Sequence, residues 1–155
     1  MSLESGQYII TSAFGGYGIG RRTIEDRSLM PKGIYVLPQD AESPWHVERL
    51  EDGTYKLKNK GDLVGSSIIG QLLAFLLPGG EIGATMNWTF RPDVKSGNPD
   101  AWVITEVGGH GRAWSVPDSN LHDIPHVVVK PLAVGLSEPP TFPPTEVFIF
   151  KKVDV

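Results

Sequence analysis

Hydrophobic and polar residues alternate in short runs along most of the chain. In Trp45-His46-Val47-Glu48 the two hydrophobic side chains fall on one face of a strand and the two polar ones on the other. Similar runs, rich in β-branched and aromatic residues, predict strands at 7–12, 33–37, 45–50, 54–59, 72–77, 86–91, 101–106, 112–116, 125–130 and 146–152. Turn residues such as Glu51-Asp52-Gly53 separate the runs. We therefore expect an all-β fold.

The runs repeat at a fixed period. Tyr8, Tyr55 and Trp102 each open a strand-like phrase, and consecutive members are 47 residues apart. The units also end alike, with an aromatic residue and a second hydrophobic residue two positions later: Trp45 and Val47, Trp88 and Phe90, and Phe148 and Phe150. Three units of about four strands give about twelve strands, and a closed barrel removes exposed sheet edges. The prediction is a β-trefoil, with a six-stranded barrel and three capping hairpins, in one domain over 1–155.

Two segments fit this repeat less well. Residues 68–77 could form a strand or a buried helix, and the missing helix caps favour the strand. Residues 132–144 form an insert in the third unit. Its two Pro-Pro pairs predict an extended segment on the surface.

Composition excludes several classes of function. The chain has no cysteine, which rules out disulfides and cysteine-based zinc sites. Its formal net charge is −4 and its basic residues are scattered, so we expect no nucleic-acid partner. The first residues lack the features of a signal peptide, and the longest apolar run is too short to cross a membrane. The expectation is a monomeric cytoplasmic protein without a membrane partner.

The sequence offers no convincing catalytic or cofactor site. His122, Asp123 and His126 could be drawn as a metal or acid–base cluster, but an ordinary polar surface loop is the favoured interpretation. The glycines at 15–20 lack the lysine and the following helix of a phosphate-binding loop. We expect no enzyme activity, no cofactor and no metal.

Carbohydrate binding is the alternative function, because many trefoil proteins are lectins. The Gln-x-Trp signature of one lectin class is absent. Trp102 and Trp114 could stack on a sugar ring, although aromatic residues at repeat positions are more often part of the core.

A loop at 24–32 presents an arginine followed by a small residue, Arg27-Ser28, and then Leu29. The specificity pocket of a trypsin-like protease has a carboxylate at its base, which suits an extended guanidinium. We expect the preceding Glu25 and Asp26 to brace the loop through hydrogen bonds to local backbone amides, as in Asx turns. If Arg27 is not the pocket residue, Lys95, Arg112 and Lys130 are the next candidates.

Four stretches together resemble one known family. They are Ser5-Gly6-Gln7-Tyr8-Ile9-Ile10, Glu25-Asp26-Arg27-Ser28-Leu29-Met30-Pro31-Lys32, the run from Trp45 to Tyr55, and Phe148-Ile149-Phe150-Lys151. The chain resembles the mycospins, fungal serine protease inhibitors with a β-trefoil fold. The resemblance implies inhibition of trypsin-like serine proteases, in defence or regulation, with Arg27 in the specificity pocket and Ser28 after the scissile bond.

Two further sites are implied by relatives and fit this sequence poorly. Some family members use a lysine between strands eleven and twelve, where this chain has Lys130-Pro131, and proline after the pocket residue suits trypsin-like cleavage badly. More distant mycocypins trap asparagine-specific proteases. Asn59 is the nearest candidate here, and no glycine follows it directly.

Overall fold

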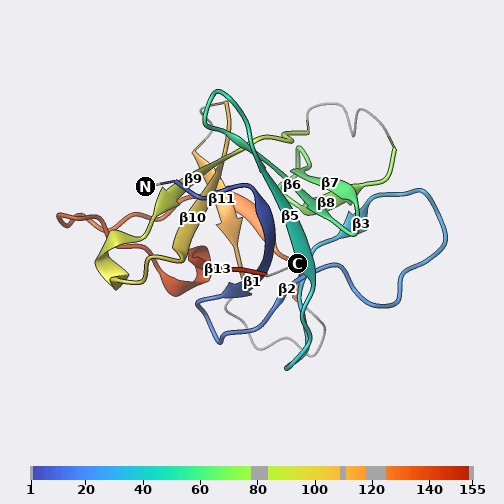
Figure 1. The fold of residues 1–155 in the computed structure, drawn as a ribbon, viewed down its shortest axis with the longest axis horizontal. Helices are drawn as coiled ribbons and strands as arrows, with labels where there is room; N and C mark the ends of the chain where they lie inside the picture. The colour runs from blue at the N-terminus through green and yellow to red at the C-terminus, as the bar shows by residue number, and fades with distance from the viewer. Residues whose placement is uncertain (1, 78–83, 109–110, 118–124, 154–155) are drawn as a thin grey trace.

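The computed structural model describes residues 2–77, 84–108, 111–117 and 125–153, and within them the regular structure is almost entirely β (Figure 1). The strands are β1 Gly6–Ser12, β2 Ile19–Gly20, β3 Lys32–Gly33, β4 Tyr35–Val36, β5 Pro44–Arg49, β6 Tyr55–Asn59, β7 Asp62–Ser66, β8 Leu72–Phe75, β9 Trp88–Pro92, β10 Ala101–Glu106, β11 Arg112–Ser115, β12 Val128–Pro131 and β13 Phe148–Lys152. Two short 3-10 helices, η1 Val94–Ser96 and η2 Pro144–Glu146, join them. Within those ranges no helix is long and apolar enough to span a membrane.

Six strands of the described chain form a closed ring. Strand β1 pairs with β5, β5 with β6, β6 with β9, β9 with β10, β10 with β13, and β13 with β1, all antiparallel. Alternate residues of β1 and β6 are buried inside the ring, as the alternating sequence pattern predicts. The ring leaves these strands without open edges.

Three antiparallel pairs cover one end of the barrel: β2 with β4, β7 with β8, and β11 with β12. They contact one another through the backbone, since Ile34 N–H donates to Leu72 O at 3.1 Å and Val127 N–H donates to Ile34 O at 2.8 Å. The predicted β-trefoil is therefore confirmed. The predicted strand at 33–37 is divided into β3 and β4 at Ile34, because Ile34 bonds to two neighbouring hairpins, and the described residues form thirteen strand segments instead of twelve.

Aromatic side chains fill the barrel in two layers. Trp114 is fully buried, and the rings of Trp45, Trp88 and Phe148, one from each repeat, each lie 5.6 Å from it. The second layer contains Tyr8, Tyr55, Phe90, Trp102 and Phe150. Trp102 and Trp114 are thus core residues, and neither ring is exposed for stacking on a sugar.

The two uncertain segments take the favoured forms. Residues 72–75 are strand β8, so the helical alternative for 68–77 is wrong, and a tight turn at 67–70 precedes it with Gly70 N–H donating to Ser67 O at 3.0 Å. The insert at 132–144 lies largely at the surface, and a bridge between Gly135 and Thr141 closes it.

Candidate functional site

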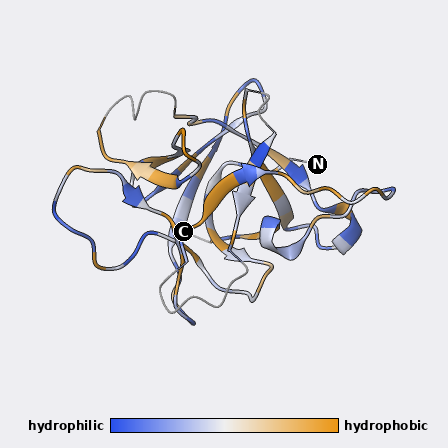
Figure 2. Cartoon of the chain, turned by 180° about the vertical axis from the view of Figure 1, so that it is seen from behind, coloured by the Kyte–Doolittle hydropathy of each residue, from blue (hydrophilic) through white to orange (hydrophobic). Residues whose placement is uncertain are grey.

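The candidate site is the loop at residues 21–31, which joins β2 to β3 and stands away from the barrel (Figure 1, the blue loop at the right). Seen from behind, it shows a mixture of hydrophilic and hydrophobic residues (Figure 2). Both ends are fixed, because β2 pairs with β4 and β3 pairs with β8. All five sequence-predicted residues, Glu25, Asp26, Arg27, Ser28 and Leu29, lie on this loop.

Arg27 is exposed near the middle of the loop. Within the described part of the chain its side chain has no hydrogen bond, ion pair or ring contact. Its surroundings include exposed apolar side chains, since Leu29 is 62% and Met30 68% exposed. The Arg27 side chain is therefore exposed, and no contact within the described residues ties its guanidinium to the barrel.

Asp26 fixes the backbone on both sides of Arg27. Its Oδ1 accepts hydrogen bonds from Ser28 N–H at 3.0 Å and from Ser28 Oγ at 2.6 Å, while the chain bends at Arg27 and Ser28. This is the Asx turn predicted from the sequence. Bonds from the Lys32 ammonium and then from Ser28 lower the pKa of Asp26 from 3.8 to about 2, so its carboxylate is charged at neutral pH.

Lys32 lies beneath the bend. Its side chain is only 7% exposed, and its Nζ forms an ion pair with the Asp26 carboxylate. The same Nζ donates to Asp26 O at 3.2 Å and to Ser28 Oγ at 3.2 Å. Ser28 Oγ also accepts from Met30 N–H at 3.3 Å, so the side-chain contacts continue past the bend.

Arg21 holds the first arm of the loop. Its guanidinium donates two hydrogen bonds to the Glu25 carboxylate, at 2.8 and 3.1 Å, and one to Asp62 Oδ2 at 2.8 Å. Burial lowers the pKa of Arg21, but the bonds to Glu25 and Asp62 outweigh this and raise it above its usual value. The expected bond from Glu25 to a backbone amide is wrong, because the nearby arginine is a stronger, bidentate partner.

Asn59, fully buried at the end of β6, connects this arm to the barrel. Its Oδ1 accepts from Arg21 N–H at 3.2 Å, and its Nδ2 donates to Ser43 Oγ at 3.0 Å. A buried amide with these bonds is not available to an asparagine-specific protease. That candidate site is therefore excluded by the burial of Asn59.

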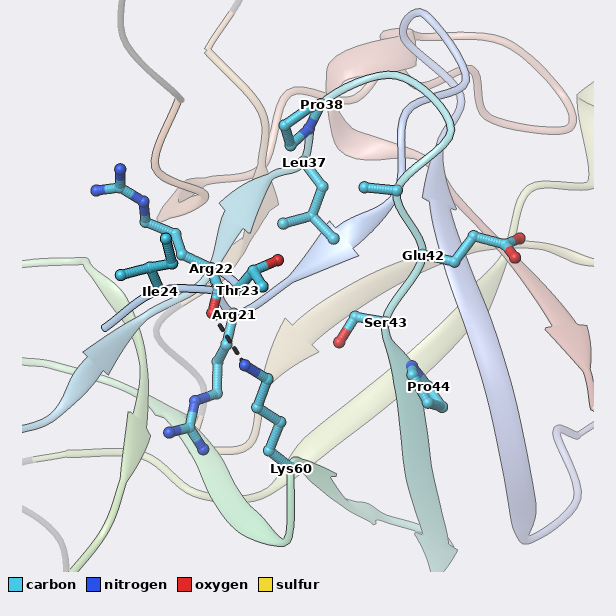
Figure 3. A pocket seen from close by; sticks show the side chains of 11 residues that line it. Arg21, Arg22, Thr23, Ile24, Leu37, Pro38, Glu42, Ser43, Pro44 and Lys60 are labelled. Carbon is cyan, nitrogen blue, oxygen red and sulfur yellow. Dashed lines mark hydrogen bonds between the residues drawn. The ribbon is translucent and has the colours of Figure 1, made fainter. Parts of the chain in front are cut away.

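A cleft of about 450 Å³ runs beside the first arm (Figure 3). At its edge Lys60 Nζ donates to Arg22 O at 2.9 Å, and Arg21 and Arg22 point in opposite directions. The Arg22 guanidinium lies over the Tyr35 ring, 5.7 Å from its centroid. The arm is thus held by the backbone and side chains of β4, β6 and the turn after β6.

The other sequence candidates lie elsewhere. Lys130 is exposed but lies within β12, paired with Ala113, and Arg112 is bound to the Glu106 carboxylate at 2.7 Å. Lys95 is exposed on η1. His122 and Asp123 lie outside the described residues, while His126 Nε2 lies 2.9 Å from Leu72 O. The described residues contain no group of side chains suited to a metal ion.

Sequence reasoning did not single out the supporting residues Lys32, Arg21, Lys60 and Asp62. Their contacts join residues up to 41 positions apart, as for Arg21 and Asp62, and no local motif marks such pairs. Asp26, Ser28 and Lys32 lie within seven positions of one another, and this spacing weakly indicates a loop whose side chains bind one another.

Comparison with known proteins agrees with this architecture. The chain matches the peptidase inhibitor I66 family over residues 1–152. It is 36% identical over 155 residues to a serine protease inhibitor of Lentinula edodes, covering 99% of this chain and 100% of that protein. The structure of a proteinase inhibitor from Coprinopsis cinerea is similar, with TM-score 0.86, 34% identity, and 98% and 100% of the two chains covered. The designed three-fold symmetric protein ThreeFoil shares the fold at 14% identity, with TM-score 0.66 over 96% and 99% of the chains. The chain therefore belongs to the peptidase inhibitor I66 family, the family of the mycospins that its sequence resembles.

Proposed function

We propose that this protein inhibits trypsin-like serine proteases by placing Arg27 in the specificity pocket of the enzyme, with Ser28 after the scissile bond. The loop binds as a substrate would, and the guanidinium meets the pocket carboxylate. The similarity to a serine protease inhibitor of Lentinula edodes and to a proteinase inhibitor from Coprinopsis cinerea supports the class of partner.

The observation that carries the proposal is the contrast between Arg27 and its neighbours. Glu25, Asp26 and Ser28 are all held by hydrogen bonds, whereas the Arg27 side chain, among the described residues, has no partner. A loop that is already ordered loses little conformational entropy on binding, so a larger part of the contact energy appears as affinity. The free guanidinium is then the group left for the enzyme to bind.

The test is titration of trypsin with the parent protein and with Arg27→Ala. We expect the variant to lose inhibition while its free energy of unfolding stays within about 1 kcal/mol of the parent, because the removed side chain is exposed. Lys95→Ala is the matched control, an exposed basic residue remote in sequence, and it should inhibit as the parent does. Inhibition by Arg27→Ala at the parent level would move the site to another basic residue.

Long incubation with trypsin at low pH should cut the chain between Arg27 and Ser28, and mass spectrometry of the fragments identifies the bond. A cut at another basic residue, with Arg27-Ser28 intact, would contradict the proposal. The cytoplasmic location, the monomeric state and a role in defence or regulation stay predictions from the sequence. A glycan-binding screen tests the lectin alternative, which loses Trp102 and Trp114 as exposed aromatic residues.

A further inference from the structure

We propose that Lys32 is a positioning residue that spans the scissile Arg27–Ser28 bond and keeps the two ends together after the enzyme cuts it, so that the bond is re-formed. This inference rests on the proposed function, because it concerns the same loop. It adds a role for a buried side chain that does not touch the specificity pocket.

The contacts of Lys32 lie on both sides of the bond. On the residue before Arg27, its Nζ binds the carbonyl oxygen of Asp26, at 3.2 Å, and the Asp26 carboxylate. On the residue after Arg27, it binds Ser28 Oγ at 3.2 Å. A lysine ammonium has three N–H donors, and these three oxygens match them. Arg27 is the only residue between the two anchor points.

The ammonium is attached to the scaffold and not to the loop. Lys32 is the first residue of β3, where it pairs with Ala74 of β8 in a capping hairpin. Removing a charged group from water is costly unless it is paired and hydrogen-bonded, and this lysine is 7% exposed with all its donors used. The backbone of Lys32 is thus fixed at the barrel end by the pairing of β3 with β8, and its buried side chain carries the ammonium to Asp26 and Ser28.

The chemistry explains why this position matters. The protease serine oxygen attacks the Arg27 carbonyl carbon, the bond to the Ser28 nitrogen breaks, and the enzyme histidine gives that nitrogen its proton. The acyl-enzyme then has two fates. Water attacks it and leaves an Arg27 carboxylate, or the Ser28 amine attacks it, restores the peptide bond and releases the serine.

The second fate requires the Ser28 amine to stay beside the ester. Groups held in reacting geometry have effective concentrations far above that of a free group in solution. Lys32 holds Ser28 through its hydroxyl and Asp26 through its carbonyl, and Asp26 also bonds to Ser28 directly at 2.6 Å. The new amine therefore remains within reach, and the cut form returns to the intact form.

The experiment measures the ratio of cut to intact inhibitor at equilibrium. Parent and Lys32→Met are each incubated with a catalytic amount of trypsin, starting from the intact chain and from the purified cut chain, and the two forms are quantified by mass spectrometry. We expect the ratio to rise about tenfold or more in Lys32→Met, and re-formation from the cut chain to slow, because the effective concentration of the amine falls.

Lys60→Met is the matched comparison. Lys60 Nζ also binds a loop carbonyl, Arg22 O at 2.9 Å, but within the part of the chain that the structure describes this bond reaches only the arm before the scissile bond. Its loss can weaken binding, yet the ratio of cut to intact chain should stay close to that of the parent. Ser28→Ala removes the far contact at an exposed position and should raise the ratio in the same direction as Lys32→Met. If Lys32→Met fails to fold, an unchanged ratio in Ser28→Ala would still overturn the role of Lys32, because that variant lacks the Lys32 contact on the far side of the bond.

The outcomes separate the two proposals. If the parent does not inhibit trypsin, the proposed function is wrong. If the parent inhibits and is cut at Arg27–Ser28, but folded Lys32→Met and Ser28→Ala keep the parent ratio, then the role of Lys32 is wrong while the inhibitory function stands. An equal rise in Lys60→Met would show general loosening of the loop and would also overturn the role of Lys32.

Discussion

Arg27 and the likewise exposed Arg49 differ from the other four arginines in how their charge is used. Arg21 and Arg112 form ion pairs with carboxylates, and Arg22 and Arg91 lie over aromatic rings. Within the described residues the Arg27 side chain has no such contact. Most exposed arginines are simply hydrated, so exposure alone says little. What distinguishes Arg27 is that Asp26 and Ser28, on either side of it, are bound to the same lysine.

The Asp26 carboxylate gives the loop a defined pH dependence. Its pKa is lowered from 3.8 to about 2, first by Lys32 and then by Ser28. Because the pKa of Asp26 is lower in the folded state than in the unfolded state, the charged carboxylate stabilises the fold at pH values above the unfolded-state pKa. This stabilisation is lost as the pH falls through the folded-state pKa. We expect the stability difference between the parent and Asp26→Asn to shrink from about pH 4 to about pH 2, measured by urea unfolding.

Asp52 provides the matched control for this prediction. It forms the same kind of turn, accepting from Thr54 N–H at 2.9 Å and Thr54 Oγ1 at 2.7 Å, and these bonds lower its pKa without a lysine. Asp52→Asn should therefore show a weaker pH effect over the same range. Equal effects in the two variants would mean that Lys32 contributes nothing beyond the Asx turn.

At the scale of elements, the first arm of the loop depends on the shape of one guanidinium. The Arg21 guanidinium donates four hydrogen bonds, two to Glu25 and one each to Asp62 and the Asn59 carbonyl, whereas an ammonium has only three donors. Arg21→Lys should cost about 2 kcal/mol in unfolding free energy, since it breaks bonds of a buried guanidinium to partly buried carboxylates, and should weaken trypsin inhibition. Denaturant unfolding and inhibition titration measure the two effects.

Arg22→Lys is the control on the adjacent residue. Arg22 is exposed and its guanidinium contacts only the Tyr35 ring among the described residues, so the change should stay within about 0.5 kcal/mol. Similar losses in both variants would show that the ion pairs of Arg21 do not support the arm.

The strands that the sequence predicted are those with strong alternation and aromatic residues. The missed strands β2, with Ile19-Gly20, and β7, which contains Gly65, are short or interrupted by glycine. Gly65 lies so close to Thr85 O, 2.5 Å from an added Cβ, that packing requires a residue of low strand propensity there. Tertiary contacts, which a local pattern does not record, determine these two strands.

The candidate site also has features that the local sequence predicts and features that only tertiary contacts determine. Arg27-Ser28 and the Asx turn at Asp26 follow from residue type and local order, so the sequence could predict them. Lys32 also lies nearby, but its burial beneath the bend depends on the pairing of β3 with β8. The contact between Arg21 and Asn59 joins the first arm of the loop to β6 across 38 positions, and only the folded trefoil brings them together.

At the scale of the whole molecule, the aromatic core is linked to the loop. Trp45 packs on Trp114 at the barrel centre, and its Nε1 donates to Ile19 O at 2.8 Å. Ile19 is the first residue of β2. Arg21, at the base of the first arm, directly follows this two-residue strand. The indole of Trp45 therefore holds the strand from which the loop departs. Trp114 packs in the same core, but its Nε1 has no partner among the described residues.

This asymmetry predicts different results for two similar substitutions. Trp45→Phe and Trp114→Phe both remove part of a buried indole, but only the first leaves a backbone carbonyl, Ile19 O, without its donor. We expect Trp45→Phe to be the less stable variant by about 1–2 kcal/mol in denaturant unfolding, because an unpaired buried acceptor is costly. Trp45→Phe should also weaken trypsin inhibition more at a temperature where both variants are folded, since it frees β2. If Trp114→Phe affects inhibition as much, the core supports the loop through packing as a whole and not through the bond between Trp45 and β2.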